Sequence, residues 1–387
     1  MLLTIFTFLI VLSVLVLVHE FGHFLAAKKA GIKVEEFGFG YPPRLFGKKF
    51  GETIYSLNWL PFGGFVKLHG EELTASGKKD DRAFWAKSKK ARMVVIVAGV
   101  LANFLLAIVV FSVVYSFSGI PTKTDKIKIV DIASDSPAEK FGLKEGDIIL
   151  AVGENKISAL QDFTRLVREK TNQLLKIVVK RDVNNPCQEK VLGGGTGFSC
   201  QNGNLILFIT PRENPPEGEG PLGVAVSDME MIKYPFWQMP FWGTIEGFKE
   251  AFGWTILIVN SLGKMMIDLV ARGIVPKDVA GPVGIFQITG IVAKSGVLNV
   301  LQFIGILSVN LAVINILPFP ALDGGRFIFV AYEVITRRRP RPSLENWINT
   351  AGMATLLFLI FLVTLNDLTR IINFSSLIEQ IRLSFPK

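Results

Sequence analysis

Four long apolar stretches stand out along this 387-residue chain, at residues 2–27, 93–117, 298–317 and 351–365. The hydrocarbon core of a bilayer is about 30 Å thick and takes about 20 residues of helix to cross, so each stretch is predicted to be a membrane span. Lysine and arginine gather between residues 28 and 92 and again at 337–341, which is typical of cytoplasmic loops. The pattern predicts a polytopic α-helical membrane protein with about four transmembrane helices, whose two chain ends lie outside the cytoplasm.

The first basic loop contains two aromatic, glycine-rich runs without a helical period, at residues 37–43 and 56–68. Runs of this kind are typical of short strands in a hairpin. Such backbone enters a membrane only where protein or a water-filled cavity satisfies it. Residues 34–70 are therefore predicted to form a membrane-associated, re-entrant β-like loop, with an ordinary cytoplasmic hairpin as the alternative. Its edge would take an extended substrate by strand addition, with Gly63 and Gly64 as candidate substrate contacts.

Residues 121–228 have the composition of a soluble, extracytoplasmic domain. Strands are predicted at 127–130, 146–152, 155–157, 175–180 and 205–210, and helices at 136–142 and 160–170. The run Ser-Pro-Ala-x-x-x-Gly-Leu-x-x-Gly-Asp-Ile-Ile at 136–149 resembles an α+β PDZ domain of the circularly permuted bacterial kind. That resemblance implies a groove for peptide carboxyl termini, with residues 220–224 as a candidate carboxylate-binding turn. A structural lid that binds no peptide is the alternative.

Residues 229–297 are amphipathic and rich in aromatic side chains, which favours helices at the outer membrane interface. The apolar part at 254–270 is interrupted by Asn260, Lys264 and Asp268, so it is predicted to be interfacial rather than spanning. The chain is thus divided into the first half of a membrane core (1–120), the PDZ-like domain (121–228), the interfacial helices (229–297) and the second half of the core (298–387).

Charge and cysteine content narrow the function classes. The formal net charge is +9, but the basic residues lie beside the spans, where they orient the chain and contact the lipid bilayer. Nucleic acid is therefore not an expected partner. Cys187 and Cys200 lie in one polar insertion of the soluble segment. They would close a loop in an oxidising compartment, and two free thiols are an equal alternative.

The first apolar stretch contains His19-Glu20-x-x-His23. In a helix the two histidines lie one turn apart on one face, which suits two ligands of a tetrahedral Zn²⁺, and Glu20 projects beside them toward a bound water. Ionisable side chains inside a span are costly and mark functional sites, whereas a pair of satisfied buried histidines is the alternative. At about 1.5 Å per residue, His19 lies about 25 Å along the helix, toward the cytoplasmic side of the membrane.

A catalytic zinc needs a third protein ligand and leaves one position to water. His69 lies in the cytoplasmic loop and both cysteines lie outside, so Asp323 is the best remaining candidate. Pro318 and Pro320 cannot sit inside a regular helix, and the chain is expected to break there and present Asp323 from an irregular segment. A capping aspartate in an ordinary Asp-Gly turn is the alternative.

His19-Glu20-x-x-His23 in a first span, the Pro-x-Pro-x-Leu-Asp-Gly run at 318–324 and an inserted PDZ-like domain together resemble the bacterial site-2 proteases. These are intramembrane zinc metalloproteases that include the regulator of sigma-E protease. The resemblance implies an endopeptidase of the bacterial inner membrane that cuts the membrane segments of single-span proteins, such as anti-sigma factors or remnant signal peptides. It implies that His19, His23 and Asp323 bind zinc, Glu20 is the catalytic acid and base, and Asn310 and Asn315 bind substrate. The chain has one PDZ-like segment where the best-known relative has two.

Two other function classes make different demands on the sequence. A non-proteolytic membrane scaffold would bind peptide termini at the PDZ-like domain and keep a structural zinc, but structural sites usually have four protein ligands and no fourth is present. A transporter that uses intramembrane carboxylates would have inverted repeats, which the two halves do not show. Asn103, in the second apolar stretch, is interpreted as a helix-packing contact rather than a catalytic group.

Overall fold

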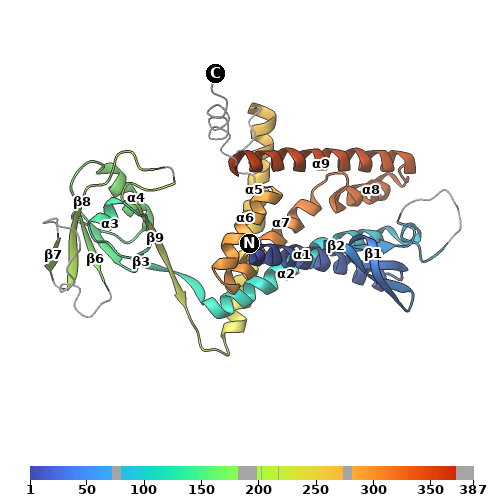
Figure 1. Cartoon of the computed structure of the whole chain (residues 1–387), viewed down its shortest axis with the longest axis horizontal. Helices are drawn as coiled ribbons and strands as arrows, with labels where there is room; N and C mark the ends of the chain where they lie inside the picture. Colours follow the sequence, from blue (N-terminus) through green and yellow to red (C-terminus); the bar gives the residue numbers. More distant parts are fainter. Residues whose placement is uncertain (72–79, 182–197, 202, 217, 273–280, 372–387) are drawn as a thin grey trace, which may run out of the picture. The chain divides into compact units, whose positions relative to one another are not determined.

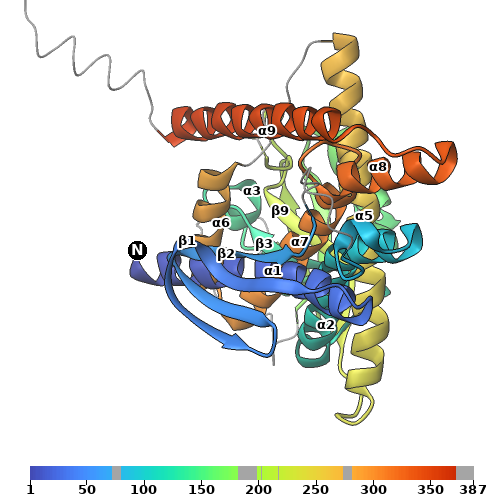
Figure 2. The same cartoon turned by 90° about the vertical axis from the view of Figure 1, so that its right-hand side faces the viewer.

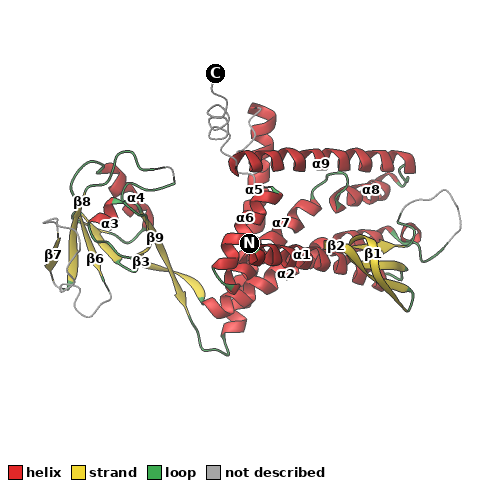
Figure 3. Cartoon of the chain, viewed as in Figure 1, coloured by secondary structure: helices red, strands yellow, loops and turns green. Residues whose placement is uncertain are grey.

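The computed structural model describes residues 1–71, 80–181, 198–201, 203–216, 218–272 and 281–371, and Cys187 falls outside this part (Figure 1). The chain divides into two compact units, one made of Met1–Ser118 and Pro235–Lys387 and the other of Gly119–Tyr234. Figure 3 shows that helices dominate the first unit and strands the second.

Four described helices of the first unit are long and apolar enough to cross a membrane. They are α1 (Leu2–Lys29), α2 (Lys89–Ser118), α7 (Val297–Ile316) and α9 (Pro342–Ile371). They cover the four predicted spans, although α9 begins well before residue 351. Lys28 and Lys29 lie in the last turn of α1, where positive charge interacts favourably with the helix dipole. Pro342 is the first residue of α9, a position at which the N–H that proline lacks would have no partner within the helix.

The contact between α1 and α2 is close because small residues line it (Figure 1). A Cβ atom on Gly22 of α1 would lie 2.7 Å from the Cβ of Ala102 on α2, and still closer to the carbonyl oxygen of Ala98. Only glycine fits at this distance, as is common where membrane helices approach each other. The face of α1 that carries His19 and His23 is thereby held against α2.

The segment predicted as interfacial helices differs from the prediction. A strand of the second unit extends to Ile232, and one helix of 34 residues, α5 (Met239–Arg272), follows, with a shorter helix α6 (Pro282–Lys294) after it. α5 packs against α2, where a Cβ on Gly247 would lie 2.5 Å from Ser112 Oγ. α5 is not among the four candidate spans of the described residues, and the interfacial position of 254–270 stays a prediction.

Two long strands, β1 (Val34–Phe50) and β2 (Thr53–Leu68), form an antiparallel ribbon beside α1 (Figure 2). The predicted hairpin is therefore present, with longer strands than the two apolar runs indicated. Its base packs on α1, where Val34 and Leu68 are buried with Ala27. The ribbon folds back on itself, because residues 36–39 of β1 pair with both 54–57 and 64–67 of β2, and Thr53 Oγ1 donates a hydrogen bond to the carbonyl oxygen of Val34 at 2.9 Å. It exposes large apolar side chains, among them Phe50 at 77% and Trp59 at 64%. Contact of these side chains with the membrane stays a prediction.

The second unit is one antiparallel sheet with the strand order β7-β8-β6-β4-β3-β9 and with β5 paired to β4. Its elements are β3 (Ile120–Ile132), α3 (Pro137–Lys140), β4 (Ile148–Val152), β5 (Asn155–Lys156), α4 (Leu160–Glu169), β6 (Leu175–Lys180), β7 (Phe198–Gln201), β8 (Asn204–Ile209) and β9 (Val224–Ile232). Alternate residues of β6, such as Ile177 and Val179, face the core. β7 and β9 were not predicted, and Cys200 in β7 is disulfide-bonded.

The break after α7 corrects one detail of the predicted site. Pro318 and Pro320 do lie in a break after α7, but the break covers only residues 317–322 and a new helix, α8 (Asp323–Thr336), follows, so Asp323 is its first residue rather than part of an irregular segment. A Cβ on Gly324 would lie 2.6 Å from the carbonyl carbon of Ile316, and only glycine permits this tight turn. An acidic residue is favoured in the first turn of a helix because the amide dipoles point their positive end there.

Candidate metal centre

Three side chains from two helices bring one ligand atom each to the same point. His19 and His23 lie one turn apart on α1, and Asp323 begins α8. The two Nε2 atoms are 3.2 Å apart, and Asp323 Oδ2 lies 3.1 Å from His19 Nε2 and 3.2 Å from His23 Nε2. The histidines are only 7% and 9% exposed. In the described part of the chain this is the one cluster of His, Cys, Asp or Glu whose atoms could share a metal ion.

Helix α2 determines how the two imidazoles point. His23 Nδ1 lies 2.8 Å from the carbonyl oxygen of Val95, so Nδ1 carries the proton and donates it, and the lone pair of Nε2 faces Asp323. His19 Nδ1 lies 3.4 Å from the amide of Asn103, which is fully buried. The two ends of an amide are assigned from their hydrogen bonds, and the oxygen of Asn103 has no partner in the present orientation. With the amide turned by 180°, this oxygen accepts a hydrogen bond from Nδ1–H of His19.

Gly99 makes this approach of α2 possible. A Cβ atom on Gly99 would lie 2.8 Å from Cε1 of both His19 and His23, and closer still to His23 Nε2. Any larger residue at this position would have to displace an imidazole. The face of α2 that carries Val95, Gly99 and Asn103 is therefore part of the site.

The three ligand atoms have the spacing and the chemistry of a zinc site. Zinc ligands lie about 2.0–2.1 Å from the metal, so two ligands of one tetrahedron are about 3.3 Å apart, close to the observed separations. Asp323 Oδ2 is buried and accepts no hydrogen bond, because the facing Nε2 of His23 has no proton to donate. A buried carboxylate oxygen that faces imidazole lone pairs needs a cation. Two neutral imidazoles and one carboxylate, with a fourth position open, match catalytic rather than structural zinc sites.

Glu20 is next to the ligands on α1 and is held by the β-ribbon. Its Oε2 accepts a hydrogen bond from the backbone N–H of Val66 in β2 at 3.0 Å. Gly64 adjoins this carboxylate, since a Cβ there would lie 4.0 Å from Cγ of Glu20, an ordinary contact, whereas it would lie only 2.9 Å from the carbonyl oxygen of Gly38 in β1. One carboxylate oxygen is thus anchored, which leaves Oε1 for proton transfer.

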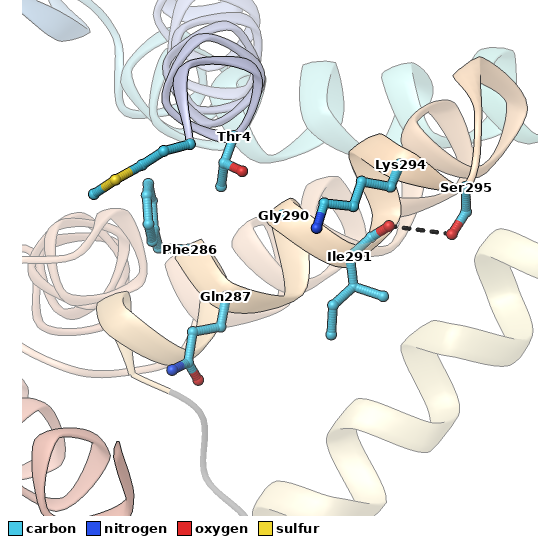
Figure 4. Close-up of a pocket in the computed structure, with 8 residues that line it drawn as sticks. Thr4, Phe286, Gln287, Gly290, Ile291, Lys294 and Ser295 are labelled. Atoms are coloured by element: carbon cyan, nitrogen blue, oxygen red, sulfur yellow. Dashed lines mark hydrogen bonds between the residues drawn. The ribbon is translucent and has the colours of Figure 1, made fainter. Parts of the chain in front are cut away.

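A cavity of about 1800 Å³ leads to the centre, and its lining includes His19, Glu20, His23 and Asp323. Charged residues of α2, α8 and the end of β2 make up much of its remaining wall. A smaller cavity of about 600 Å³ lies between the start of α1 and α6 (Figure 4). None of the side chains that line it is a carboxylate, histidine or cysteine, so it offers neither metal ligands nor a general base.

The predicted substrate-binding residues occupy different places around the centre. Asn315 Nδ2 lies 3.4 Å from His19 Nε2, whereas no hydrogen bond or ion pair among the described residues joins Asn310 to the three ligands. Gly64 adjoins Glu20, and Gly63 packs against the ring of Tyr41. The structure therefore brings Asn315 to His19 and Gly64 to Glu20, whereas the contacts of Asn310 and Gly63 in the described residues do not tie them to the centre.

Asn103 is the residue whose importance the sequence did not reveal. We interpreted it as a packing contact, and its backbone oxygen does accept a hydrogen bond from Ser308 at 2.8 Å, but its amide adjoins His19. A signal was present in the sequence, because Gly99 and Asn103 are one turn apart in an otherwise apolar helix. A small residue followed one turn later by an amide indicates a helix that comes close to a polar group.

The sequence matches known proteins over nearly its whole length. The model of "Peptidase family M50" matches residues 7–359. A Clostridium perfringens protein with the provisional name of zinc metalloprotease is 35% identical over 93% of this chain and 97% of its own. The zinc metalloprotease RasP of Geobacillus kaustophilus is 29% identical over 95% of this chain and 98% of its own.

A third relative, the regulator of sigma-W protease RasP of Bacillus subtilis, is 26% identical over 95% of this chain and 99% of its own. With four candidate spans, these similarities identify a multi-pass bacterial membrane protein. The chain therefore belongs to peptidase family M50, the site-2 proteases, and is a zinc-dependent protease.

Proposed function

We propose that this protein is an intramembrane endopeptidase that cuts the membrane-spanning segments of single-span membrane proteins. The observation that carries the proposal is the meeting of His19 and His23, from a candidate membrane span, with Asp323, which follows another. Because the histidines lie in an apolar helix, the peptide bonds nearest to them are those of a substrate within the membrane. The large, charge-lined cavity supports the supply of water that hydrolysis there requires.

His19, His23 and Asp323 would hold the zinc ion, which supplies, when bound, a Lewis acid that polarises the scissile carbonyl and lowers the pKa of water. Glu20 takes the proton of the attacking water at Oε1 and passes it to the leaving amine. The hydrogen bond from Val66 to Oε2 keeps that carboxylate oriented through both transfers. Asp323 and the α2 contacts of both histidines keep the ligand atoms together while Glu20 exchanges protons.

The substrate chain must be extended before its peptide bonds can be reached, because helical backbone is closed by its own hydrogen bonds. The edge of β2 near Gly63 and Gly64 suits an added strand and lies beside Glu20. Asn310 and Asn315 of α7 would donate hydrogen bonds to the substrate backbone from the opposite side. The position of Asn315 next to His19 supports this role.

We further infer that the protein lies in the inner membrane with both chain ends and the Gly119–Tyr234 unit outside the cytoplasm. The basic residues between α1 and α2, and between α8 and α9, support this orientation. The name of the Bacillus subtilis relative refers to sigma-W regulation. Single-span anti-sigma factors are therefore the first substrates to examine, followed by remnant signal peptides.

The decisive experiment compares the protein with its Glu20→Gln variant on a single-span substrate in lipid vesicles. We expect the variant to lose at least about a hundredfold in rate, the usual contribution of a general base, while retaining zinc. Glu154→Gln, which changes an exposed acid in the turn between β4 and β5, should cut at the normal rate. Cleavage by Glu20→Gln at the normal rate would reject Glu20 as the base. Products cut only outside the apolar segment would reject intramembrane cleavage.

A second function, peptide binding by the Gly119–Tyr234 unit, is favoured by one observation. β9 is an end strand of the sheet and follows directly on Gly223, whose φ of +73° closes the turn at residues 220–224. A PDZ-like groove at this edge would bind a peptide through its terminal carboxylate. The full chain should then bind a peptide with a free carboxyl end more tightly than its amidated form, and equal binding would reject the groove.

A further inference from the structure

A buried ion pair joins the two helices that flank the metal centre. Arg92, in the first turn of α2, donates from Nη2 to Oε2 of Glu333 near the end of α8 at 2.6 Å. Both side chains are 8% exposed.

The pair is held by contacts on both sides. Arg339 donates from Nε to Oε1 of Glu333 at 3.1 Å and from Nη2 to the backbone oxygen of Trp85 at 3.2 Å. Lys89 donates from Nζ to the backbone oxygen of Glu333 at 2.6 Å. The last turns of α8 are thus bound to the first turn of α2 by Lys89 and Arg92, while Arg339 joins Glu333 to Trp85, just before α2.

Each partner stands at the unfavourable end of its own helix. A cation near a helix amino terminus and an anion near a carboxyl terminus are both repelled by the helix dipole, so neither residue stabilises its own helix. Buried ion pairs in general add little to stability, and their best supported use is to fix the register of packed elements. The observation therefore points to a function in placing α8 relative to α2.

The geometry connects this register to the metal ligands. Glu333 lies ten residues after Asp323 on the same helix, about 15 Å along its axis. Arg92 lies one turn before Val95 and two turns before Gly99, the residues that contact His23 and both imidazoles. A shift of α8 along α2 would therefore move Asp323 relative to the two histidines.

We propose that Arg92 and Glu333 are positioning residues that set the distance between Asp323 and the two histidines, and so the affinity of the centre for its metal. This inference rests on the proposed metal ligands. It predicts that breaking the pair loosens metal binding although no ligand is changed. A group hydrogen-bonded to a metal ligand typically changes metal affinity by about ten- to a hundredfold. Arg92 and Glu333 act on the ligands only through their helices, so we expect an effect of about the lower figure.

The test uses Co²⁺ in the purified full-length protein, because tetrahedral Co²⁺ has visible absorption bands that report its ligand geometry. Glu333→Gln should bind Co²⁺ about tenfold more weakly and show altered bands, with kcat reduced and KM unchanged. Arg92→Lys keeps the charge but loses the planar fork, so it should fall between the wild type and Arg92→Gln. Lys249→Gln, which changes an exposed lysine on α5, is the control and should behave as wild type.

The outcomes separate this inference from the proposed centre. Absence of a tetrahedral Co²⁺ spectrum in the wild type would reject the metal centre itself. A wild-type spectrum that stays unchanged in affinity and shape in Glu333→Gln and Arg92→Gln would overturn the positioning role, even if both variants melt earlier. If Glu333→Gln does not fold, the graded effect of Arg92→Lys and Arg92→Gln decides, and equal Co²⁺ affinity in these two and the wild type would overturn the proposal.

Discussion

Replacing Gly99 by alanine tests the close approach of α2 to both histidines with a single methyl group. The added Cβ would lie 2.8 Å from Cε1 of His19 and of His23. Favourable carbon contacts are about 3.5 Å or longer, and the added Cβ would lie closer still to His23 Nε2, so both rings must move by at least about 0.7 Å. Functional groups tolerate displacements of about 0.5 Å, and an error of about 1 Å costs about a hundredfold in rate.

Two effects on stability oppose each other in this variant. Alanine is favoured over glycine in a helix interior by about 0.5–1 kcal/mol, whereas overpacking typically costs about 1–3 kcal/mol. Because the crowded atoms are imidazole atoms held by Val95 and Asn103, we expect overpacking to win. Gly99→Ala should therefore have a lower Tm than the wild type, bind zinc about ten- to a hundredfold more weakly, and cut substrate about a hundredfold more slowly.

Gly253→Ala is the matched control, because Gly253 is an exposed helical glycine of α5 with no atom within 4 Å of an added Cβ. It should gain up to about 1 kcal/mol and keep normal activity. The assays are thermal unfolding, zinc binding by competition with a chelator, and cleavage of a single-span substrate in vesicles. If Gly99→Ala bound zinc and cut substrate as the wild type does, α2 would not form a wall of the site.

Two more outcomes are expected. Asn103→Leu removes the amide beside His19 Nδ1, so zinc affinity should fall about ten- to a hundredfold, and unchanged affinity would show that His19 is oriented without it. The hydrogen bond from His69, 2.8 Å away, lowers the pKa of Glu35, so the stability that Glu35 contributes is complete above about pH 4.3 and is lost below it. Glu35→Gln should reduce the loss of Tm between about pH 6 and pH 3, and an equal loss in both proteins would contradict this.

The sequence predicted the features that depend on local pattern. The four spans follow from apolar length alone, and His19-Glu20-x-x-His23 requires only that residues 19–23 be helical. Asp323 was found by excluding the other candidate ligands. The start of α8 at that residue was not predicted, because two prolines indicate a break but not where the next helix begins. Gly324 permits that start because it packs closely against the backbone at the end of α7.

Features that depend on packing between distant segments were predicted less well. Lys264 and Asp268 interrupt the apolar run and led to the interfacial prediction, but they gave no indication that Gly247 of the same helix, α5, packs against α2. The sequence shows that Asn103 lies among apolar residues, but it does not show that the Asn103 amide contacts the imidazole of His19, 84 residues earlier in the chain. Single-residue propensities contain no information about such partners.

One face of α2 contacts every part of the candidate metal centre that lies on α1, and it also contacts α8. Arg92, Val95, Gly99 and Asn103 are spaced by three or four residues, so they lie along a single stripe of the helix. In order they contact Glu333 of α8, His23, both imidazoles and His19.

The opposite stripe of α2 has a different character. Val94, Leu101 and Leu105 are 62%, 53% and 58% exposed, and their side chains are all apolar. Exchanging one apolar residue for another there should leave zinc affinity unchanged, whereas each change on the first stripe acts on a ligand or on the helix that carries one. If His19, His23 and Asp323 bind the zinc as proposed, the metal depends on three helices although only α1 and α8 supply ligands, because α2 contacts both histidines and also Glu333 of α8.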